Sequence, residues 1–362
     1  MPSHHVPRSA RLHRPLMAAA LVAAAVLVTA PQASAAGPVP AVPSLPPATS
    51  AVAAHDQAVT GAEQKAVLDH WTPERIAALT QPSSGHPPKA GPDGAPWTGR
   101  NALARTVGRL FFTDHGEDAS CTATVVDSPN GSTLVTAAHC VNNTDLIGED
   151  NQWTRNVLFV PGYRDGRAPY GKFTGRLGVV APTWPANDQQ HGEVYGAYDQ
   201  AFVVLNTDAR GRTVQEAAGA AQRIGFDRPG DRTAHQFGYP RSASDPDREG
   251  LPEYTGERLA YCTGRPEQVV GTPEFPAAEG LWGTDCVMGG GSSGGPRIAG
   301  LDPESGVGTV VGDNSEGSRL DAGGNACDPW DPALGCTRHL VGPQFTSAVT
   351  KPLYERARRA LR

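Results

Sequence analysis

Short apolar runs alternate with Gly, Asn, Asp and Pro from about residue 103 onward. Runs of this kind, bounded by turn residues, predict β-strands, and many of them in succession predict a sandwich or a barrel. The predicted strands cover residues 107–112, 121–126, 133–136, 157–160, 201–205, 236–239, 259–262 and 308–312. Helical periodicity is confined to residues 217–224 and 349–361. We therefore predict an all-β fold with a C-terminal helix.

The N-terminal residues have the pattern of a leader. Arg8, Arg11 and Arg14 precede an apolar run over residues 16–28, which a small-residue site at 33–35 follows. This order is typical of a secretory signal peptide, and the run is shorter than the about 20 residues that cross a bilayer. We predict a signal peptide over residues 1–35 and a secreted, extracellular product with no membrane span in the mature form.

Residues 36–100 are rich in Pro, Ala and Gly. Because proline fixes φ and lacks a donor, we expect this stretch to be extended, without regular ladders. One exception is a short apolar face near residues 64–79, with a helix starting at residues 72–74. This face consists of Val67, Leu68, Trp71, Ile76 and Leu79. We predict a leader or pro-region over 36–100 and one catalytic domain over 101–362.

Composition narrows the function classes. The net charge is −6, with no basic stripe of the kind that nucleic-acid binding requires. Six cysteines, an even number in an exported chain, predict three disulfides, although the count alone leaves the pairing open. Since no Cys-x-x-Cys or His-x-x-x-His occurs, we expect neither a metal nor another cofactor.

Two local motifs carry the candidate chemistry. Residues 134–140 run from an apolar strand into a small-residue turn that presents His139. Residues 289–296 surround Ser293 with glycines, which permit a tight turn and converging backbone N–H groups. A serine hydroxyl needs a base to become a nucleophile, and histidine serves this purpose near neutral pH.

A carboxylate is needed to orient the histidine. Asp199 stands before the apolar run 201–205, where burial would demand a partner for its charge. Asp188 and Asp208 lie nearby and are the alternatives. The chain order His139, Asp199, Ser293 is the order of chymotrypsin-type enzymes.

Residues 136–140 and 291–296 together resemble the motifs of secreted bacterial serine peptidases with the chymotrypsin fold, in the trypsin-like and glutamyl-endopeptidase-like branch. The resemblance covers about residue 107 to the C-terminus. It implies two six-stranded antiparallel β-barrels and polypeptide substrates, and we expect a monomer. It also implies Ser293 as nucleophile, His139 as base and acid, Asp199 as orienter, and the N–H groups of Gly291 and Ser293 as the oxyanion hole.

The resemblance further implies a Cys121–Cys140 disulfide, which leaves Cys262–Cys286 and Cys327–Cys336 as the economical pairs. Two positions depart from the family pattern. Ser292 replaces the usual Asp before the nucleophile, so zymogen activation by a freed N-terminal amine is not expected. Asn314 stands where glutamate-specific relatives have a His, which leaves the side-chain preference open.

Two other function classes fit parts of the sequence. Residues 291–295 also match the Gly-x-Ser-x-Gly elbow of esterases, with His339 as the base, although only a short chain follows Ser293. A chymotrypsin-fold binding protein without activity is the second alternative, and the loss of a triad residue would be its mark. The endopeptidase is the reading that uses all three candidate residues.

Overall fold

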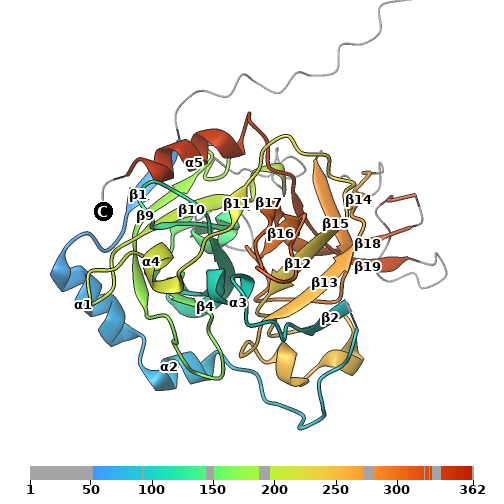
Figure 1. Cartoon of the computed structure of the whole chain (residues 1–362), viewed down its shortest axis with the longest axis horizontal. Coiled ribbons are helices and arrows are strands. Elements are labelled where there is room, and N and C mark those ends of the chain that lie inside the picture. The colour runs from blue at the N-terminus through green and yellow to red at the C-terminus, as the bar shows by residue number, and fades with distance from the viewer. Residues whose placement is uncertain are drawn as a thin grey trace, which may run out of the picture. The chain divides into compact units, whose positions relative to one another are not determined.

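The computed structural model describes residues 52–360, apart from 92, 144–150, 187–195, 272–279, 322, 326 and 328–335. The predicted signal peptide, residues 1–35, lies outside these residues. Among the described residues, no helix is long and apolar enough to cross a membrane. The fold is mostly β, as the sequence predicts (Figure 1).

The first half of the fold is a closed barrel of six antiparallel strands. The order is β8-β9-β10-β5-β4-β3, and β3 pairs with β8 to close the ring. The strands are β3 (Val107–Asp114), β4 (Glu117–Val125), β5 (Thr133–Thr136), β8 (Arg155–Pro161), β9 (Phe173–Val180) and β10 (Ala201–Leu205). Strands β5 and β10 are buried along their whole length, which places the residues at their ends in fixed positions.

The second half consists of two sheets among the described residues. The first has the order β11-β17-β16-β12-β13-β2 and the second β14-β15-β19-β18. An isolated bridge between Gly312 and Gln344 links them, where the resemblance implied one closed second barrel. The strands are β2 (Asp93–Pro96), β11 (Arg223–Ile224), β12 (Ala234–Gly238), β13 (Ala260–Gly264), β14 (Glu267–Gln268), β15 (Leu281–Asp285), β16 (Pro296–Ala299), β17 (Thr309–Asp313), β18 (Glu316–Leu320) and β19 (Thr337–Pro343).

The C-terminal helix α5 (Thr350–Arg358) confirms the helix expected at the end of the chain. Figure 1 shows it beside β9 and β10, and Leu353 and Ala357 bury its apolar face. The other predicted helix, 217–224, is wrong. There the chain forms α4 (Val214–Ala218), which Gly219 ends in the left-handed region at φ 63°, and then enters β11.

The Pro-rich segment differs most from expectation. It forms β1 (Ala53–Asp56), which pairs with β9, and β2, which pairs with β13. Helices α1 (Gly61–His70) and α2 (Pro73–Ala78) lie between them. The expectation that residues 36–100 lack ladders is therefore wrong at 53–56 and 93–96. Between its prolines the segment has enough free N–H groups to extend both sheets at their edges.

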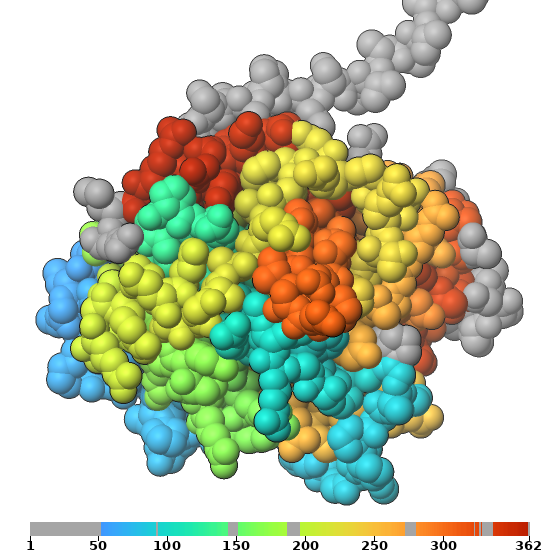
Figure 2. Space-filling model, viewed as in Figure 1, coloured from blue at the N-terminus to red at the C-terminus, as the bar shows by residue number. Residues whose placement is uncertain are grey.

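The short apolar face of this segment anchors it on the barrel. Trp71 is 1% exposed, packs on Phe111 with ring centroids 5.4 Å apart, and donates its indole N–H to Asn156 O. Val67, Ile76 and Leu79 join the same core, whereas Leu68 is exposed. Figure 2 shows the blue and cyan atoms of the segment packed against the rest of the fold.

The remaining described elements are short: α3 (Leu103–Thr106), the 3-10 turn η1 (Ala138–Cys140), and the pair β6 (Asn142–Asn143) and β7 (Gln152–Trp153). Of these, η1 carries the candidate residue His139 directly out of the buried strand β5.

Candidate active site

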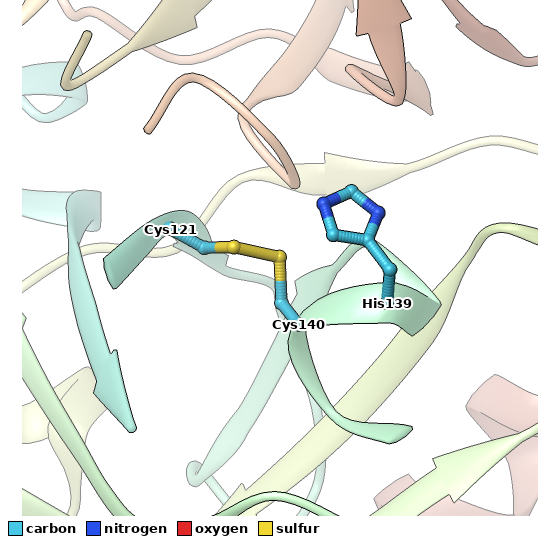
Figure 3. A group of neighbouring side chains, drawn as sticks. All are labelled: Cys121, His139 and Cys140. Atoms are coloured by element: carbon cyan, nitrogen blue, oxygen red, sulfur yellow. A yellow bond between two sulfur atoms is a disulfide. The ribbon is translucent and has the colours of Figure 1, made fainter. Parts of the chain in front are cut away.

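His139 is held by a strand end and a disulfide. Strand β5 enters η1 through Ala137 and Ala138, which are fully buried. Cys140 is bonded to Cys121 of β4, and Figure 3 shows the His139 ring beside this disulfide. The sulfur atoms of Cys121 and Cys140 lie close to the ring, but both are used by the disulfide, so only the imidazole could bind a metal here.

Both carboxylate oxygens of Asp199 accept hydrogen bonds from His139. Oδ2 accepts from the ring Nδ1 at 2.8 Å, and Oδ1 accepts from the backbone N–H of His139 at 2.9 Å. The hydroxyl of Ser315 donates a third bond, at 2.5 Å. Asp199 is 3% exposed, so these bonds replace the water that its charge would otherwise need.

The other two carboxylates have different surroundings. Asp208 forms an ion pair with Arg212 at 2.8 Å and accepts backbone bonds within its own turn. Asp188 lies outside the described residues. Asp199 is thus the carboxylate that the structure brings to His139.

The electrostatics of the pair follow from this geometry. Burial lowers the pKa of His139, but the charge and hydrogen bonds of Asp199 outweigh it, and the pKa is raised above 6.5. For Asp199, burial raises the pKa, but the His139 charge and the hydrogen bonds from His139 and Ser315 outweigh burial, so the pKa is lowered overall. The net effect is an ionised Asp199 beside a histidine that is a stronger base than usual.

Ser293 lies in a loop that packs against the same strands. Its carbonyl accepts from the N–H of Thr122 in β4 at 2.8 Å. Gly294 follows with φ +74°, and a Cβ there would lie 2.0 Å from Thr136 Oγ1, so the loop needs glycine to approach β5. Ser293 is half-buried, and its hydroxyl makes no hydrogen bond to His139 in the described structure. Such bonds are often long before substrate binds.

Two backbone N–H groups of this loop have no hydrogen-bond partner among the described residues, those of Gly291 and Ser293. The preceding carbonyls are held: Gly290 O accepts from Arg241 N at 2.7 Å, and Ser292 O accepts from Asn314 Nδ2 at 3.1 Å. A peptide N–H points opposite to its carbonyl, so both N–H groups are directed away from these partners. Buried N–H groups without a partner are rare in folded proteins.

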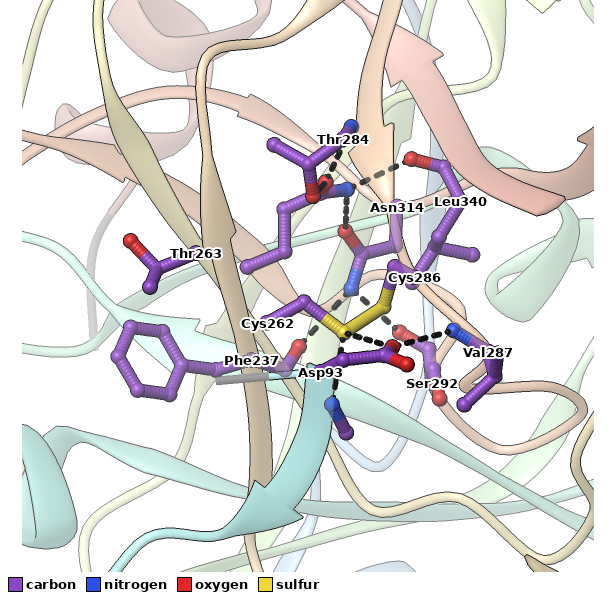
Figure 4. Close-up of a disulfide and its surroundings, with 12 residues drawn as sticks. Asp93, Phe237, Cys262, Thr263, Thr284, Cys286, Val287, Ser292, Asn314 and Leu340 are labelled. Atoms are coloured by element: carbon purple, nitrogen blue, oxygen red, sulfur yellow. Dashed lines mark hydrogen bonds between the residues drawn. A yellow bond between two sulfur atoms is a disulfide. The ribbon is translucent and has the colours of Figure 1, made fainter. Parts of the chain in front are cut away.

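Asn314 is a brace for this loop. Its Nδ2 donates to Phe237 O and Ser292 O, and its Oδ1 accepts from Gln236 (Figure 4). Gln236 also binds Thr284 and Leu340, which completes a buried polar network. Because every polar atom of Asn314 has a partner, its amide is not available to a ligand.

The three disulfides confirm Cys121–Cys140, which the resemblance implied, and the two remaining economical pairs, Cys262–Cys286 and Cys327–Cys336. The second lies next to the loop of Ser293. Asp93 of β2 accepts there from Val287 N–H at 3.2 Å, so the Pro-rich segment contacts the chain next to the Cys262–Cys286 disulfide (Figure 4).

Ser315 and Thr122 are site residues that the sequence motifs do not reveal. Thr122 Oγ1 donates to Gly291 O and accepts from Tyr239 N–H, which joins the two halves at the loop. The only signal for Ser315 is its place two residues after β17. His339, the base that an esterase would need, contacts Glu267 and Thr337 and not Ser293 among the described residues.

Among solved structures, this chain is similar to serine proteases. The thermostable serine protease AL20 from an extremophilic microorganism is 28% identical, with a TM-score of 0.54, over 72% of this chain and 100% of its own. Protease Anisep from Arthrobacter nicotinovorans is 28% identical, with a TM-score of 0.53, over 71% and 96%. A Glu endopeptidase at 18% identity and a TM-score of 0.51, over 75% and 99%, shares the fold. No protein-family model and no curated protein matches the chain.

Proposed function

The chain has the chymotrypsin-like fold of serine proteases. We propose that it is a secreted serine endopeptidase that hydrolyses peptide bonds through an acyl-enzyme on Ser293. The observation that carries the proposal is that the N–H groups of Gly291 and Ser293 have no partner among the described residues, in a loop whose Gly294 packs on Thr136 and Ala137, just before the carboxylate-bound His139. This combination has the parts that acyl transfer requires.

In the proposed first step, His139 Nε2 removes the proton of Ser293 Oγ while the oxygen attacks the carbonyl carbon of the substrate. Asp199 holds the ring by Nδ1 and stabilises the imidazolium that forms. His139 then gives the proton to the leaving amine. In the second step His139 takes a proton from water, the water oxygen attacks the acyl carbon, and the proton returns to Ser293 Oγ as the acid leaves. Two donors aimed at the developing oxyanion contribute several kcal/mol; removing one such donor costs roughly 2.7–4 kcal/mol in a protease.

The edge of the second half offers a surface for an extended peptide. Strand β18 is the last strand of its sheet and begins directly after Ser315, whose hydroxyl binds Asp199. An extended substrate can add to such an edge by main-chain hydrogen bonds. Polypeptides are therefore the proposed substrates, and no nucleic acid, metal or organic cofactor enters the mechanism. The three disulfides support export to an oxidising compartment.

Labelling with a fluorophosphonate probe tests the proposal. We expect the full-length protein to be labelled on Ser293, as mapped by mass spectrometry, and to release peptides from unfolded casein. Ser293→Ala should lose both signals with an unchanged Tm, whereas the exposed, remote Ser305→Ala should keep both. Retained labelling in Ser293→Ala sinks the assignment of the nucleophile. A folded protein that neither reacts with the probe nor cleaves casein would support the alternative hypothesis, a chymotrypsin-fold binding protein without activity.

A further inference from the structure

A polar groove adjoins the loop of Ser293. It has a volume of about 440 Å³ and is lined by Gln81, Pro82, Arg241, Ser242, Glu249, Gly250 and Gly290. None of these residues belongs to the catalytic groups described above. The groove therefore raises the question of what it binds.

The groove is joined to the oxyanion loop by main-chain bonds. Arg241 N–H donates to Gly290 O at 2.7 Å, and Ser242 O accepts from Gly289 N–H at 2.9 Å. Ser242 Oγ accepts from Gly290 N–H at 2.8 Å. A ligand in the groove thus lies within one residue of Gly291, close enough to be part of the same substrate chain.

Arg241 is a lining cation with no ion-pair partner among the described residues, although Glu249 lines the same groove. Its guanidinium makes no hydrogen bond or ion pair with the described residues, and its Nε is buried without a partner. Glu249 is not within ion-pair distance, and burial alone lowers the pKa of Arg241, so no carboxylate compensates it. A partly buried cation without a partner is costly to a folded protein and favours an anionic ligand.

A second arginine, Arg109, lies close to Arg241 but is paired with a carboxylate. Gly256, at φ +83°, fits between them, since a Cβ there would lie 2.9 Å from Arg109 Nη2 and from Arg241 Cγ. Arg109 is neutralised by Glu257 at 3.3 Å and bonded to Leu79 O. Arg241 is therefore the free cation of the pair.

The Pro-rich segment forms one wall of the groove. Gln81 N–H donates to Thr255 O at 3.0 Å, and Ser84 N–H donates to Gly250 O at 2.6 Å. These bonds hold residues 81–84 against the 249–255 loop, and Gln81 and Pro82 line the groove together with Arg241 and Ser242. The segment therefore completes the groove.

The two ends of the Ser293 loop face different charges. At residues 292–294 the loop is held by Asn314, next to Ser315 and the β18 edge. There Glu316, the first residue of β18, lies near Asp199 and His139, so two carboxylates are among the nearest titratable groups. At residues 289–290 the loop is held by Arg241 and Ser242. A peptide that pairs with β18 up to its scissile bond and then follows the Ser293 loop from residue 293 toward residue 289 would reach Arg241.

We propose that this groove is a subsite for an acidic side chain of the substrate, Asp or Glu, on the leaving-group side of the scissile bond, with Arg241 as the residue that selects it. The inference rests on the proposed peptidase activity. It makes Arg241 a specificity residue whose backbone supports the oxyanion loop and whose side chain binds substrate.

A peptide library with Asp, Ala or Lys fixed at each position, cleaved by the full-length protein and mapped by mass spectrometry, locates the preference. The best peptide is then made with Asp, Asn or Lys at that position, and with a free or an amidated C-terminus. We expect kcat/KM to favour Asp over Asn by roughly tenfold, as for a hydrogen bond to a charged group. Arg241→Gln should remove the ratio, and Arg241→Glu should invert it toward Lys. Arg232→Gln, an exposed arginine outside the groove, is the matched control.

The outcomes separate the two proposals. Cleavage without an acidic preference after the scissile bond, or a preference that Arg241→Glu leaves unchanged, overturns the subsite alone. A preference that needs a free C-terminal carboxylate and ignores the side chain also overturns it. A protein that cleaves no peptide and takes no fluorophosphonate overturns the peptidase and the subsite together. Inversion of the preference in Arg241→Glu supports the subsite, because a merely structural role of Arg241 would lower kcat/KM equally for the Asp, Asn and Lys peptides.

Discussion

Asp199 is the residue on which the acid–base chemistry of the proposed site depends. Its two oxygens bind the ring and the backbone of His139, and Ser315 adds a third bond, so a buried charge is fully partnered. Such an aspartate fixes the position of the ring and also its protonation. The two effects separate in a variant that keeps the shape and removes the charge.

Asp199→Asn is that variant. The neutral form of His139 is the base, so kcat/KM should fall as the pH drops through a pKa above 6.5. Without the aspartate charge, burial dominates and lowers the pKa of His139, so the acid limb of the profile should move to lower pH. The amide also favours the wrong tautomer, and kcat should fall by about ten-thousand-fold.

Asp208→Asn is the matched control, since Asp208 is ion-paired with Arg212 in a turn of its own. Its pH profile should superimpose on that of the original protein. An acid limb that stays in place in Asp199→Asn would transfer the orienting role to another carboxylate.

At this scale, local sequence predicts much of the candidate site. His139 and Ser293 stand in motifs whose neighbours are close in the chain, and Asp199 is marked by the buried strand behind it. Ser315, Thr122 and Asn314 act through contacts with residues far away in sequence, so nothing beside them in the chain indicates their partners. Arg241 is invisible for the same reason, because its lack of a counter-charge is a property of the folded structure.

The loop of Ser293 is the element that joins the two halves. Thr122 of the first barrel binds Gly291 O and Ser293 O, while Asn314 of the second half binds Ser292 O. Gly294 is its tightest point, because Thr136 Oγ1 and Thr122 O occupy the space of a Cβ, at 2.0 and 2.5 Å. The loop therefore tolerates no side chain at this position.

Gly294→Ala should destabilise the fold by about 3 kcal/mol or more and lower activity, since backbone strain and a backbone clash combine. Gly300→Ala is the matched control. It also has positive φ, 58°, but its Cβ would meet open space, so about 1 kcal/mol is expected from strain alone. Urea unfolding of both variants measures the difference. Equal losses would mean that the contact with Thr136 and Thr122 is not limiting.

Among the elements, strands with uninterrupted apolar runs are the ones that the sequence predicts well. Strand β10, with the run from Ala201 to Leu205, is an example. Strand β9 is missed because Gly175, Arg176 and Gly178 interrupt its pattern, although the strand is buried between β10 on one side and β8 and β1 on the other. Strands β1 and β2 are missed because their residues acquire ladder partners only when the barrel and the second half have formed.

Over the whole molecule, residues 52–100 connect both halves and the proposed substrate groove. They extend β9 through β1 and β13 through β2, bury Trp71 in the barrel core and supply Gln81 and Pro82 to the groove. A leader that is merely released would not need these contacts. The boundary predicted at residue 100 stays a prediction, and the packing favours retention of the segment up to residue 52.

Truncation decides between retention and release. Four buried side chains of the segment, Val67, Trp71, Ile76 and Leu79, contribute about 1.5–3 kcal/mol each, which together is comparable to the about 5–15 kcal/mol that holds a domain folded. A chain that starts at residue 101 should therefore lose cooperative thermal unfolding and probe labelling, while a chain that starts at residue 52 keeps both. If the shorter chain is not obtained, Trp71→Ala in the full chain should cost about 3–5 kcal/mol in urea unfolding, against little for the exposed Leu68→Ala. A shorter chain that unfolds cooperatively and reacts with the probe would make the segment separable from the catalytic fold, and the groove beside Arg241 would then lack Gln81 and Pro82.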